Sequence, residues 1–347
     1  MSKEKKKLTK LSDLGEFGLI EHLTKSIKIK NESTIIGIGD DAAVIDSKDK
    51  QQVITTDLLV EGVHFDLVYT PLKHLGYKAV AVNVSDVCAM NATPKQITVS
   101  IALSNKFSLE AIDTLYEGIK TACENYNVDL IGGDTVSSLT GLTISVTAIG
   151  EIEKDQAVLR KGAKPGDIVC MSGDTGAAYA GLQILKREKE VYLVNPNSQP
   201  DMAGYDYVLE RQLKPEARID IIKAMKVAKL TPTSMIDVSD GLSSEIIHIC
   251  KQSGTGVKLF EDKVPVDVQT IMVAEELNLD PTILAMNGGE DYELLFTIDP
   301  ADQKKLNTIE GLSIIGEIVE AEDGLKLFGR GEGFTTISAQ GWNAYEE

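Results

Sequence analysis

The residues in this chain that could do chemistry are mainly carboxylates, and they stand beside glycines or hydroxyl residues where strands and helices are expected to begin or end. A single cluster of this kind is explained by turn and helix-cap chemistry, because Asp before Gly favours turns and Asp or Ser favours helix N-caps. Several clusters in one chain favour a divalent cation, since Mg²⁺ binds through a few carboxylate and hydroxyl oxygens together with substrate phosphates. The clusters occupy Gly39–Asp41, Thr55–Asp57, Asn83–Asp86, Gly132–Asp134, Asp237–Gly241 and Gly288–Asp291.

Two of these clusters have a spacing that predicts side-chain geometry. In the strand through Thr55, Thr56 and Asp57, alternation places Thr55 and Asp57 on one sheet face and Thr56 on the other. Asn83 and Asp86 lie about one helical turn apart on one side of an otherwise apolar helix. A carboxylate in such surroundings needs a partner.

Short β-branched runs alternate with amphipathic segments, which predicts an N-terminal domain over residues 1–152 and a C-terminal domain over 153–347. In the first domain the strands are expected at 53–56, 96–103, 128–131 and 142–149, and the helices at 72–87 and 109–125. In the second, strands are expected at 168–171, 235–238, 256–260 and 292–298, with a hairpin at Asp323-Gly324. A helix from Ala177 to Leu185 is expected to be interrupted by a polar segment from Glu188 to Gly204.

Composition excludes several classes of protein. The net charge of −18 disfavours binding to nucleic acid or to anionic lipid, so an anionic substrate would need metal ions to bridge it to the protein. No stretch approaches the ~20 apolar residues that span a bilayer, and the lysine-rich N-terminus lacks the apolar region of a secretory signal. The four cysteines form no C-x-x-C pair, which favours buried reduced thiols. These features predict a cytoplasmic protein.

Familiar phosphate-binding motifs are absent from the sequence. There is no G-x-x-x-x-G-K-[ST], no third glycine at the dinucleotide-binding spacing after Gly37 and Gly39, and no H-R-D or D-F-G set. His64 and His248 lack the neighbours of a hydrolase triad, and His248 is expected to serve packing. Any phosphate must therefore be bound by a different scaffold.

Taken together, the motifs resemble those of the thiamine-monophosphate kinases, within the wider family of aminoimidazole ribonucleotide synthetase and selenophosphate synthetase. The histidine-containing string Thr55–Phe65 and the Gly-Gly-Glu-Asp-Tyr-Glu string at residue 288 favour the thiamine branch. The matching strings, which span roughly residues 12 to 343 in the family's order, are Gly15–Ile20, Gly37–Ala42, Thr55–Phe65, Lys78–Asp86, Ile131–Thr135, Arg160–Asp167, Ile236–Leu242 and Gly288–Leu294.

The resemblance implies a two-domain fold of the aminoimidazole ribonucleotide synthetase type. An N-terminal α/β domain would form the sheet of a homodimer, and a C-terminal α+β domain would close over the active site. The activity implied is ATP-dependent phosphorylation of thiamine monophosphate to thiamine diphosphate. Because the attacking phosphate is already ionised near neutral pH and needs no strong base, we expect direct in-line transfer without a phosphoenzyme.

The resemblance also implies a role for individual residues. The residues implied to hold magnesium ions are Asp41, Thr55, Thr56, Asp57, Asp86, Asp134, Asp237 and Asp240. Those implied to contact ATP are Gly133, Asp134, Arg160 and Ser239, and those implied at the thiamine phosphate are His64, Glu290 and, by ring stacking, Trp342. Asn91 occupies a position where glycine is commoner in the family, and it is expected to adopt a left-handed turn.

Other interpretations remain open from the residues themselves. A relative with another substrate could be a ligase that makes aminoimidazole ribonucleotide or a selenophosphate synthetase. The latter is disfavoured because no reactive Cys or Lys lies in a glycine-rich N-terminal segment. A non-catalytic nucleotide-binding or scaffold protein would show gaps in the acidic set, and a generic acidic protein would leave the ordered motifs unexplained.

Overall fold

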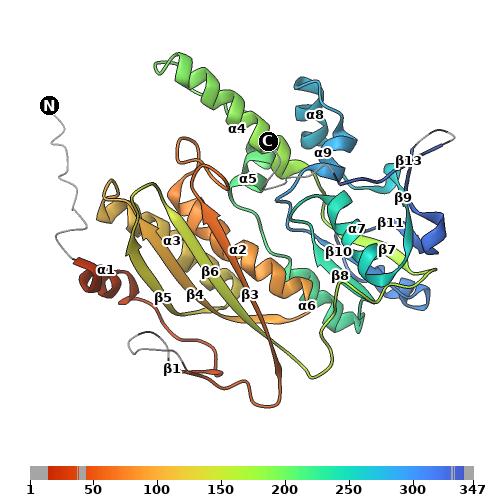
Figure 1. The fold of residues 1–347 in the computed structure, drawn as a ribbon, viewed down its shortest axis with the longest axis horizontal. Coiled ribbons are helices and arrows are strands. Elements are labelled where there is room, and N and C mark those ends of the chain that lie inside the picture. Colours follow the sequence, from red (N-terminus) through yellow and green to blue (C-terminus); the bar gives the residue numbers. More distant parts are fainter. Residues whose placement is uncertain (1–14, 37, 39–43, 330, 332, 340–347) are drawn as a thin grey trace. The chain divides into compact units, whose positions relative to one another are not determined.

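The computed structural model describes all residues except 1–14, 37, 39–43, 330, 332 and 340–347 (Figure 1). Asp41 and Trp342, two of the predicted site residues, lie outside the described residues. The chain forms two compact units: the first contains the residues up to Val87 together with Thr93–Lys154, and the second contains Cys88–Ala92 and the residues from Asp155 onward.

The first unit is built on a four-stranded sheet with the strand order β3-β6-β4-β5 among the described residues. The β3/β6 and β6/β4 pairs are antiparallel, and β4/β5 is parallel. Helices α2 and α3 lie on one face of this sheet (Figure 1). Its elements are α1 (Gly15–Thr24), β1 (Thr34–Ile36), β2 (Val44–Ile45), β3 (Gln51–Val60), α2 (Leu72–Ala89), β4 (Thr93–Leu103), α3 (Leu109–Tyr126), β5 (Asp129–Ser137) and β6 (Thr143–Ile152).

Helices α2 and α3 pack closely through a pair of glycines. A Cβ on Gly76 would lie 2.0 Å from the Leu115 carbonyl oxygen, and one on Gly118 would lie 1.9 Å from the Lys73 carbonyl oxygen. Any larger residue at either position would push the helices apart. The backbone contact therefore fixes how α2 presents its side chains to the sheet.

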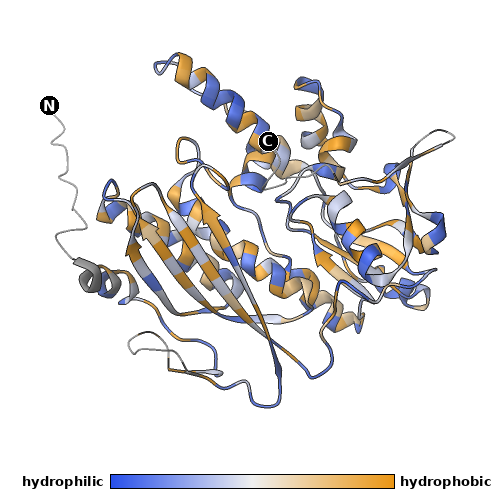
Figure 2. Cartoon of the chain, viewed as in Figure 1, coloured by the Kyte–Doolittle hydropathy of each residue, from blue (hydrophilic) through white to orange (hydrophobic). Residues whose placement is uncertain are grey.

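The predicted strands and helices of the first unit are confirmed, with ends extended by a few residues. The predicted alternation in β3 is confirmed as well: Thr55 and Asp57 are partly buried on the side of α2, whereas Thr56 is exposed on the other side. Figure 2 shows apolar and polar residues alternating along the strands of this sheet.

The second unit contains a seven-stranded sheet with the order β13-β12-β9-β11-β7-β10-β8 among the described residues. Apolar side chains from this sheet and from α7 form one buried core, and α4, α5, α8 and α9 share a second. The strands are β7 (Ile168–Ser172), β8 (Ser234–Asp237), β9 (Gly256–Phe260), β10 (Leu294–Ile298), β11 (Leu312–Val319), β12 (Leu325–Phe328) and β13 (Phe334–Thr336). The helices are α4 (Ala177–Val194), α5 (Asp206–Leu213), α6 (Ile219–Ala228), α7 (Leu242–Ser253), α8 (Val268–Glu276), α9 (Pro281–Asn287) and α10 (Gln303–Leu306).

Two local predictions for the second unit are wrong. Helix α4 continues to Val194, because the Lys, Arg and Glu residues that follow Leu185 are good helix formers, so their polarity does not end the helix. The expected hairpin at Asp323-Gly324 is a 3₁₀ turn (Ala321–Asp323) that joins β11 to β12. These two strands do not pair with each other, since both pair with β9, which lies between them.

Three smaller features concern the backbone, the thiols and the helix lengths. Asn91 has φ +60°, so the predicted left-handed turn is confirmed. All four cysteines are free and buried, as expected. Among the described helices none is long and apolar enough to cross a membrane.

Candidate active site

The first group of predicted site residues meets between β3 and α2, on the inner face of the first unit's sheet. The Thr55 hydroxyl donates a hydrogen bond of 2.6 Å to Asp86 Oδ2, which lies 31 positions further along the chain. Asp57 lies on the same face of β3, two residues after Thr55. The predicted ligands Thr55, Asp57 and Asp86 are therefore close neighbours, although the sequence separates the strand from the helix.

Asp57 and Asp86 influence each other electrostatically. Burial, and then the negative charge of Asp86, raise the pKa of the Asp57 carboxyl from 3.8 to about 6. Two carboxylates that disfavour each other's ionised form are stabilised by a cation placed between or beside them.

Asn83 joins the strand to the helix at this point. Its Oδ1 accepts a hydrogen bond of 2.9 Å from the Asp57 backbone N–H, and its Nδ2 donates one of 3.0 Å to the Ala79 carbonyl oxygen. The side chain is fully buried, so both bonds are shielded from water. Asn83 therefore sets the position of Asp57 relative to Asp86.

Two other predicted residues of the first unit lie on the outer face of the same sheet. The Thr56 hydroxyl donates to the Val146 carbonyl oxygen at 3.1 Å and accepts from the Thr147 hydroxyl at 3.1 Å. Asp134 is exposed on β5, and the strand register places it in the row of Leu58, which also points outward. Neither the Thr56 hydroxyl nor the Asp134 carboxylate joins the inner group of ligands, so their metal-binding role stays a prediction.

Gly133 precedes Asp134 and lies opposite Val99 in the parallel pair β4/β5. A Cβ at this position would lie 1.8 Å from the Val99 carbonyl oxygen. Only glycine permits this close approach of the two strands.

His64 follows β3, and its Nδ1 accepts a hydrogen bond of 3.1 Å from the Val60 backbone N–H, which fixes the ring against the end of the strand.

The second group of predicted residues surrounds the end of β8 and the start of α7 in the second unit. Asp237 ends β8 and is buried, and Ser239 and Asp240 form the turn that leads into α7. Glu245, on the first turn of α7, accepts hydrogen bonds from the Asp240 backbone N–H at 3.0 Å and from the Ser239 hydroxyl at 3.5 Å. Glu245 was not predicted as a site residue, yet it holds this turn in place.

The charges around this turn have opposing effects on Asp240. Burial raises the pKa of Asp240, and the nearby Glu290 adds to the rise, while His248 and Arg160 lower it. Arg160 and His248 are both exposed, so the prediction that His248 serves packing is wrong. The turn therefore combines carboxylates with Arg160 and His248, whose nitrogen donors could pair with phosphate oxygens.

Glu290 is bonded directly to the turn that carries Ser239. The Glu290 backbone N–H donates to the Ser239 carbonyl oxygen at 2.7 Å. The Glu290 carboxylate Oε2 accepts a hydrogen bond from Gln212 Nε2, also at 2.7 Å. Backbone and side chain of Glu290 are thus each held by a separate bond.

The next residue, Asp291, ties the same segment to the start of α4. It is fully buried and accepts from the Gly176 N–H at 2.7 Å and from the Ala178 N–H at 3.3 Å. Burial raises the pKa of Asp291 to about 7, even though Arg211 and these two amides oppose the rise. The acidic segment is therefore anchored on both sides of the Glu290 side chain.

The residues around Asp57 and Asp86 fit a magnesium ion by the chemistry of their donor atoms. Two carboxylates and one hydroxyl are hard oxygen ligands, and Mg²⁺ is commonly held by one or two carboxylates with waters and substrate phosphates completing its shell. Within the part of the chain that the structure describes, no three His, Cys, Asp or Glu side chains come together as a metal site. Any ion here would therefore depend on oxygens beyond these carboxylates, including those of the substrates.

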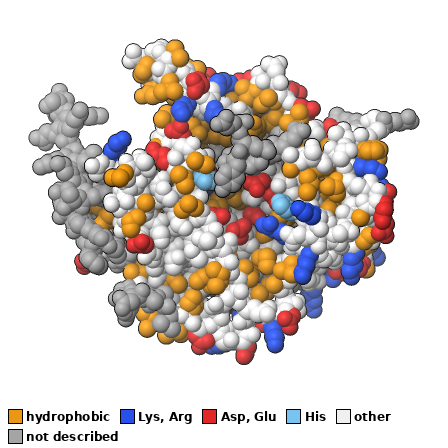
Figure 3. All heavy atoms as spheres, viewed as in Figure 1, with side chains coloured by type: hydrophobic (Ala, Val, Ile, Leu, Met, Phe, Trp, Pro, Cys, Tyr) orange, Lys and Arg blue, Asp and Glu red, His pale blue; other side chains and the backbone are white. Residues whose placement is uncertain are grey.

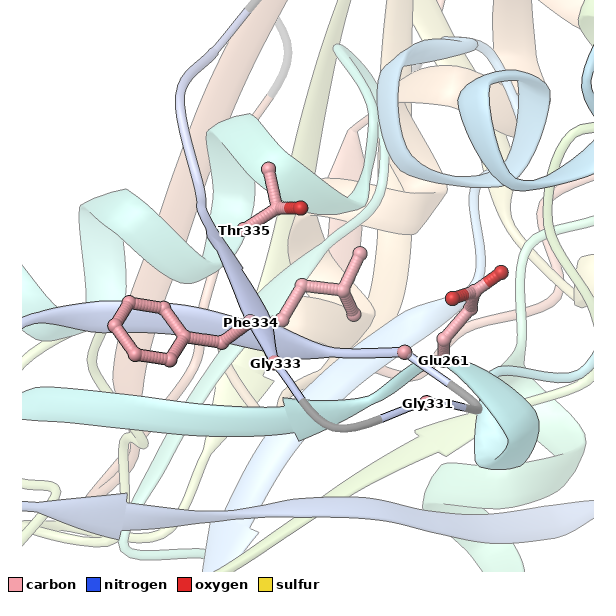
Figure 4. Close-up of a pocket in the computed structure, with 7 residues that line it drawn as sticks. Glu261, Gly331, Gly333, Phe334 and Thr335 are labelled. Carbon is pink, nitrogen blue, oxygen red and sulfur yellow. The ribbon is translucent and has the colours of Figure 1, made fainter.

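A surface cavity of about 320 Å³ lies elsewhere in the second unit, at the β12–β13 hairpin (Figure 4). Glu261, Leu327 and Phe334 line it together with glycines of the hairpin. Among the predicted site residues that the structure describes, none borders this cavity.

Three residues that shape the site were assigned no role from the sequence: Asn83, Gln212 and Glu245. The Asn83-x-x-Asp86 spacing was a usable signal, because it places both side chains on the face of α2 that meets β3. Glu245 and Gln212 had no such signal, since their partners are set by the packing of α7 and α5.

The fold and the N-terminal sequence define the class of protein. Residues 39–152 match the family model described as "AIR synthase related protein, N-terminal domain". The fold is shared with the hydrogenase maturation protein HypE in complex with ATP, with a TM-score of 0.72, 21% identity and coverage of 95% of this chain and 93% of that one. The predicted two-domain fold class is confirmed.

Similarity over nearly the whole length identifies the branch within this class. The thiamine-monophosphate kinase of Bacillus subtilis (strain 168) is 39% identical over 286 residues, which cover 82% of this chain and 84% of that protein. The thiamine-monophosphate kinase of Aquifex aeolicus (strain VF5) is 37% identical over 326 residues, which cover 93% of this chain and 98% of that protein. The structure of AaThiL complexed with AMPPCP and TMP has a TM-score of 0.74 and 33% identity, and covers 99% of this chain and 100% of that one. The chain belongs to the thiamine-monophosphate kinase family.

Proposed function

We propose that this protein transfers the γ-phosphoryl group of ATP to thiamine monophosphate, producing thiamine diphosphate in the biosynthesis of that cofactor. The observation that carries the proposal is the likeness to thiamine-monophosphate kinases over nearly the full chain. The neighbouring carboxylates Asp57 and Asp86 support it, because a transfer between two phosphates needs a site that attracts cations.

Each predicted residue keeps its role as part of this proposal. Thr55, Asp57 and Asp86 bind Mg²⁺ from the inner face of the first unit's sheet, and the remaining metal ligands are Asp41, Thr56, Asp134, Asp237 and Asp240. The ATP-binding residues are Gly133, Asp134, Arg160 and Ser239. The acceptor-binding residues are His64, Glu290 and Trp342. Residues 1–152 and 153–347 are the corresponding functional domains.

The reaction requires two anions to approach each other. An oxygen of the acceptor phosphate attacks the γ-phosphorus of ATP, a new O–P bond forms, and the bond from that phosphorus to the bridging oxygen of ADP breaks. Bound Mg²⁺ offsets the repulsion and stabilises the charge that develops on the transferred group. Arg160 pairs with phosphate oxygens, and no strong base is needed, because the acceptor phosphate is largely ionised near neutral pH.

An assay with purified protein tests the proposed function. We expect ATP with Mg²⁺ and thiamine monophosphate to yield thiamine diphosphate and ADP, which chromatography and mass spectrometry identify. Thiamine, aminoimidazole ribonucleotide precursors and selenide serve as alternative acceptors. Product formation from one of these acceptors in place of thiamine monophosphate would overturn the proposal.

The in-line route has its own test. We expect no covalent phosphoenzyme during a single turnover with γ-labelled ATP, because the acceptor oxygen attacks the phosphorus directly. Label that remains on acid-quenched protein and then passes to the acceptor would contradict this route.

We also propose that the protein is a homodimer paired through the outer face of the first unit's sheet. Ile54 and Leu58 of β3 and Val136 of β5 are 63%, 53% and 50% exposed there. Hydroxyl side chains lie between them on the same face. Figure 3 shows hydrophobic side chains and few charged ones in the region over this sheet. A second copy would remove this apolar surface from water and offer partners to the hydroxyls.

Replacing Leu58 with Lys is expected to convert the dimer to a monomer, because a buried lysine without a partner opposes pairing. Light scattering coupled to size-exclusion chromatography should give a mass of about twice 37.6 kDa for the wild type and about 37.6 kDa for Leu58→Lys. Val227→Lys, at an 86% exposed position on α6, is the matched control and should remain dimeric. A monomeric wild type at the same concentration would refute the pairing.

The cytoplasm is the proposed location of the protein. Four free, buried cysteines are typical of proteins that fold in a reducing compartment.

A further inference from the structure

Helix α5 is held unusually close to α4. A Cβ on Gly181 of α4 would lie 2.0 Å from the Val208 carbonyl oxygen and 3.1 Å from the Gln212 Cβ. The two helices can approach this closely only because residue 181 is glycine. The last turn of α5 is therefore fixed relative to the start of α4.

Two consecutive residues in that last turn bond to the acidic segment around Glu290. Arg211 Nη1 pairs with Glu293 Oε1 at 3.0 Å, and its Nη2 donates to the Asp291 carbonyl oxygen at 3.3 Å. Gln212 Nε2 donates to Glu290 Oε2 at 2.7 Å. Gln212 is only 5% exposed, so water competes little for this bond.

The backbone of Glu290 is also restrained. Its φ of +68° lies in the left-handed region that non-glycine residues seldom adopt, and its N–H donates to the Ser239 carbonyl oxygen at 2.7 Å. A fixed backbone still leaves the carboxylate several rotatable bonds from the main chain. The bond from Gln212 restricts those rotations and fixes the direction of the carboxylate.

We propose that Gln212 is a positioning residue that orients the Glu290 carboxylate toward the acceptor substrate. This inference rests on the proposed function, in which Glu290 binds the acceptor. A carboxylate held in one direction selects an acceptor that carries a hydrogen-bond donor or a positive charge on its ring. Gln212 thus contributes to acceptor specificity without touching the acceptor.

The variant Gln212→Met tests the proposal, because it removes the amide donor and keeps a side chain of similar size. Steady-state kinetics should show the KM for thiamine monophosphate raised about tenfold and the KM for ATP changed less than twofold. Gln269→Met, at an exposed position on α8, makes the same chemical change and should alter neither KM. Gln212→Leu is a second apolar variant, and circular dichroism and thermal melting verify that each variant is folded.

A double-variant cycle separates positioning from a general structural effect. If Gln212 acts through Glu290, then Gln212→Met should add no further rise in the acceptor KM once Glu290→Gln is present. Effects that multiply in the double variant would overturn the inference, as would an unchanged acceptor KM in both folded Gln212 variants. Loss of the proposed function is distinguishable, because the wild type would then fail to phosphorylate thiamine monophosphate at all.

Discussion

Replacing Asp86 with Asn is expected to lower kcat by at least about 100-fold while the protein stays folded. The change removes one of the two neighbouring carboxylates, and cation-assisted stabilisation of a phosphoryl-transfer transition state contributes several kcal/mol. Asn can still accept the 2.6 Å hydrogen bond from Thr55, so the local structure should be kept. The measurement is steady-state production of thiamine diphosphate at saturating ATP and Mg²⁺.

The same variant has an expected signature in stability. The pKa of Asp57 is raised to about 6, by burial first and then by Asp86, so the folded protein holds the Asp57 proton more tightly than the unfolded chain. The contribution of Asp57 to stability therefore falls as pH rises from about 4 to about 6, and Asp86→Asn should make this contribution smaller. Urea unfolding at pH 4, 5 and 7 measures the change.

The control for this prediction is Asp49→Asn, which neutralises an exposed carboxylate in the same unit. Asp49→Asn should leave kcat within twofold of the wild-type value. It should change the free energy of unfolding by less than about 0.5 kcal/mol. Wild-type activity in Asp86→Asn would contradict the metal-binding role proposed for Asp57 and Asp86.

Replacing Glu293 with Gln is expected to cost about 3–5 kcal/mol of unfolding free energy, because it removes the buried carboxylate that both Arg211 and Arg218 pair with, while Arg218 keeps its more exposed partner Asp220 at 2.9 Å. Glu293 is 1% exposed and pairs with Arg211 at 3.0 Å and with Arg218 at 2.6 Å. Its carboxylate also accepts a hydrogen bond from the Ser172 hydroxyl. Urea unfolding followed by circular dichroism gives the free energy directly.

A surface ion pair provides the comparison for Glu293. Glu317 is exposed and lies 3.6 Å from Lys258, so Glu317→Gln should change stability by less than about 1 kcal/mol. A loss below about 1 kcal/mol in Glu293→Gln as well would mean that the buried network contributes little. We expect Glu293→Gln also to raise the acceptor KM, since Arg211 anchors the segment that carries Glu290.

Local structure was predictable where one periodicity or one residue type decided it. The alternation through Thr55, Thr56 and Asp57 placed the first and third side chains on one face, as found. Asn91 took the left-handed conformation expected of an asparagine in place of glycine. Predictions that depended on pairing between strands were weaker: β11 and β12 looked like a hairpin, yet β9 separates them.

Polarity alone also misplaced the end of α4. The polarity of the charged residues after Leu185 predicts an interruption, but their side chains can reach water from a helix surface, and their intrinsic preference is helical. Solvent exposure of a helix is a tertiary property, so polarity by itself does not distinguish an exposed helix from a polar loop, whereas the helix propensity of these residues favours the helix.

The amino-acid sequence by itself determined which residue types are available for chemistry and which family the ordered motifs resemble. It also determined the strand or helix to which most of the candidate site residues belong. Only the tertiary structure decided which of those side chains meet. Asp57 and Asp86 come together because α2 packs on β3, and Gln212 reaches Glu290, 78 positions further along the chain, because Gly181 lets α5 approach α4. Periodicity acts over a few residues, whereas contacts between distant segments depend on how whole elements pack, and no local pattern encodes that.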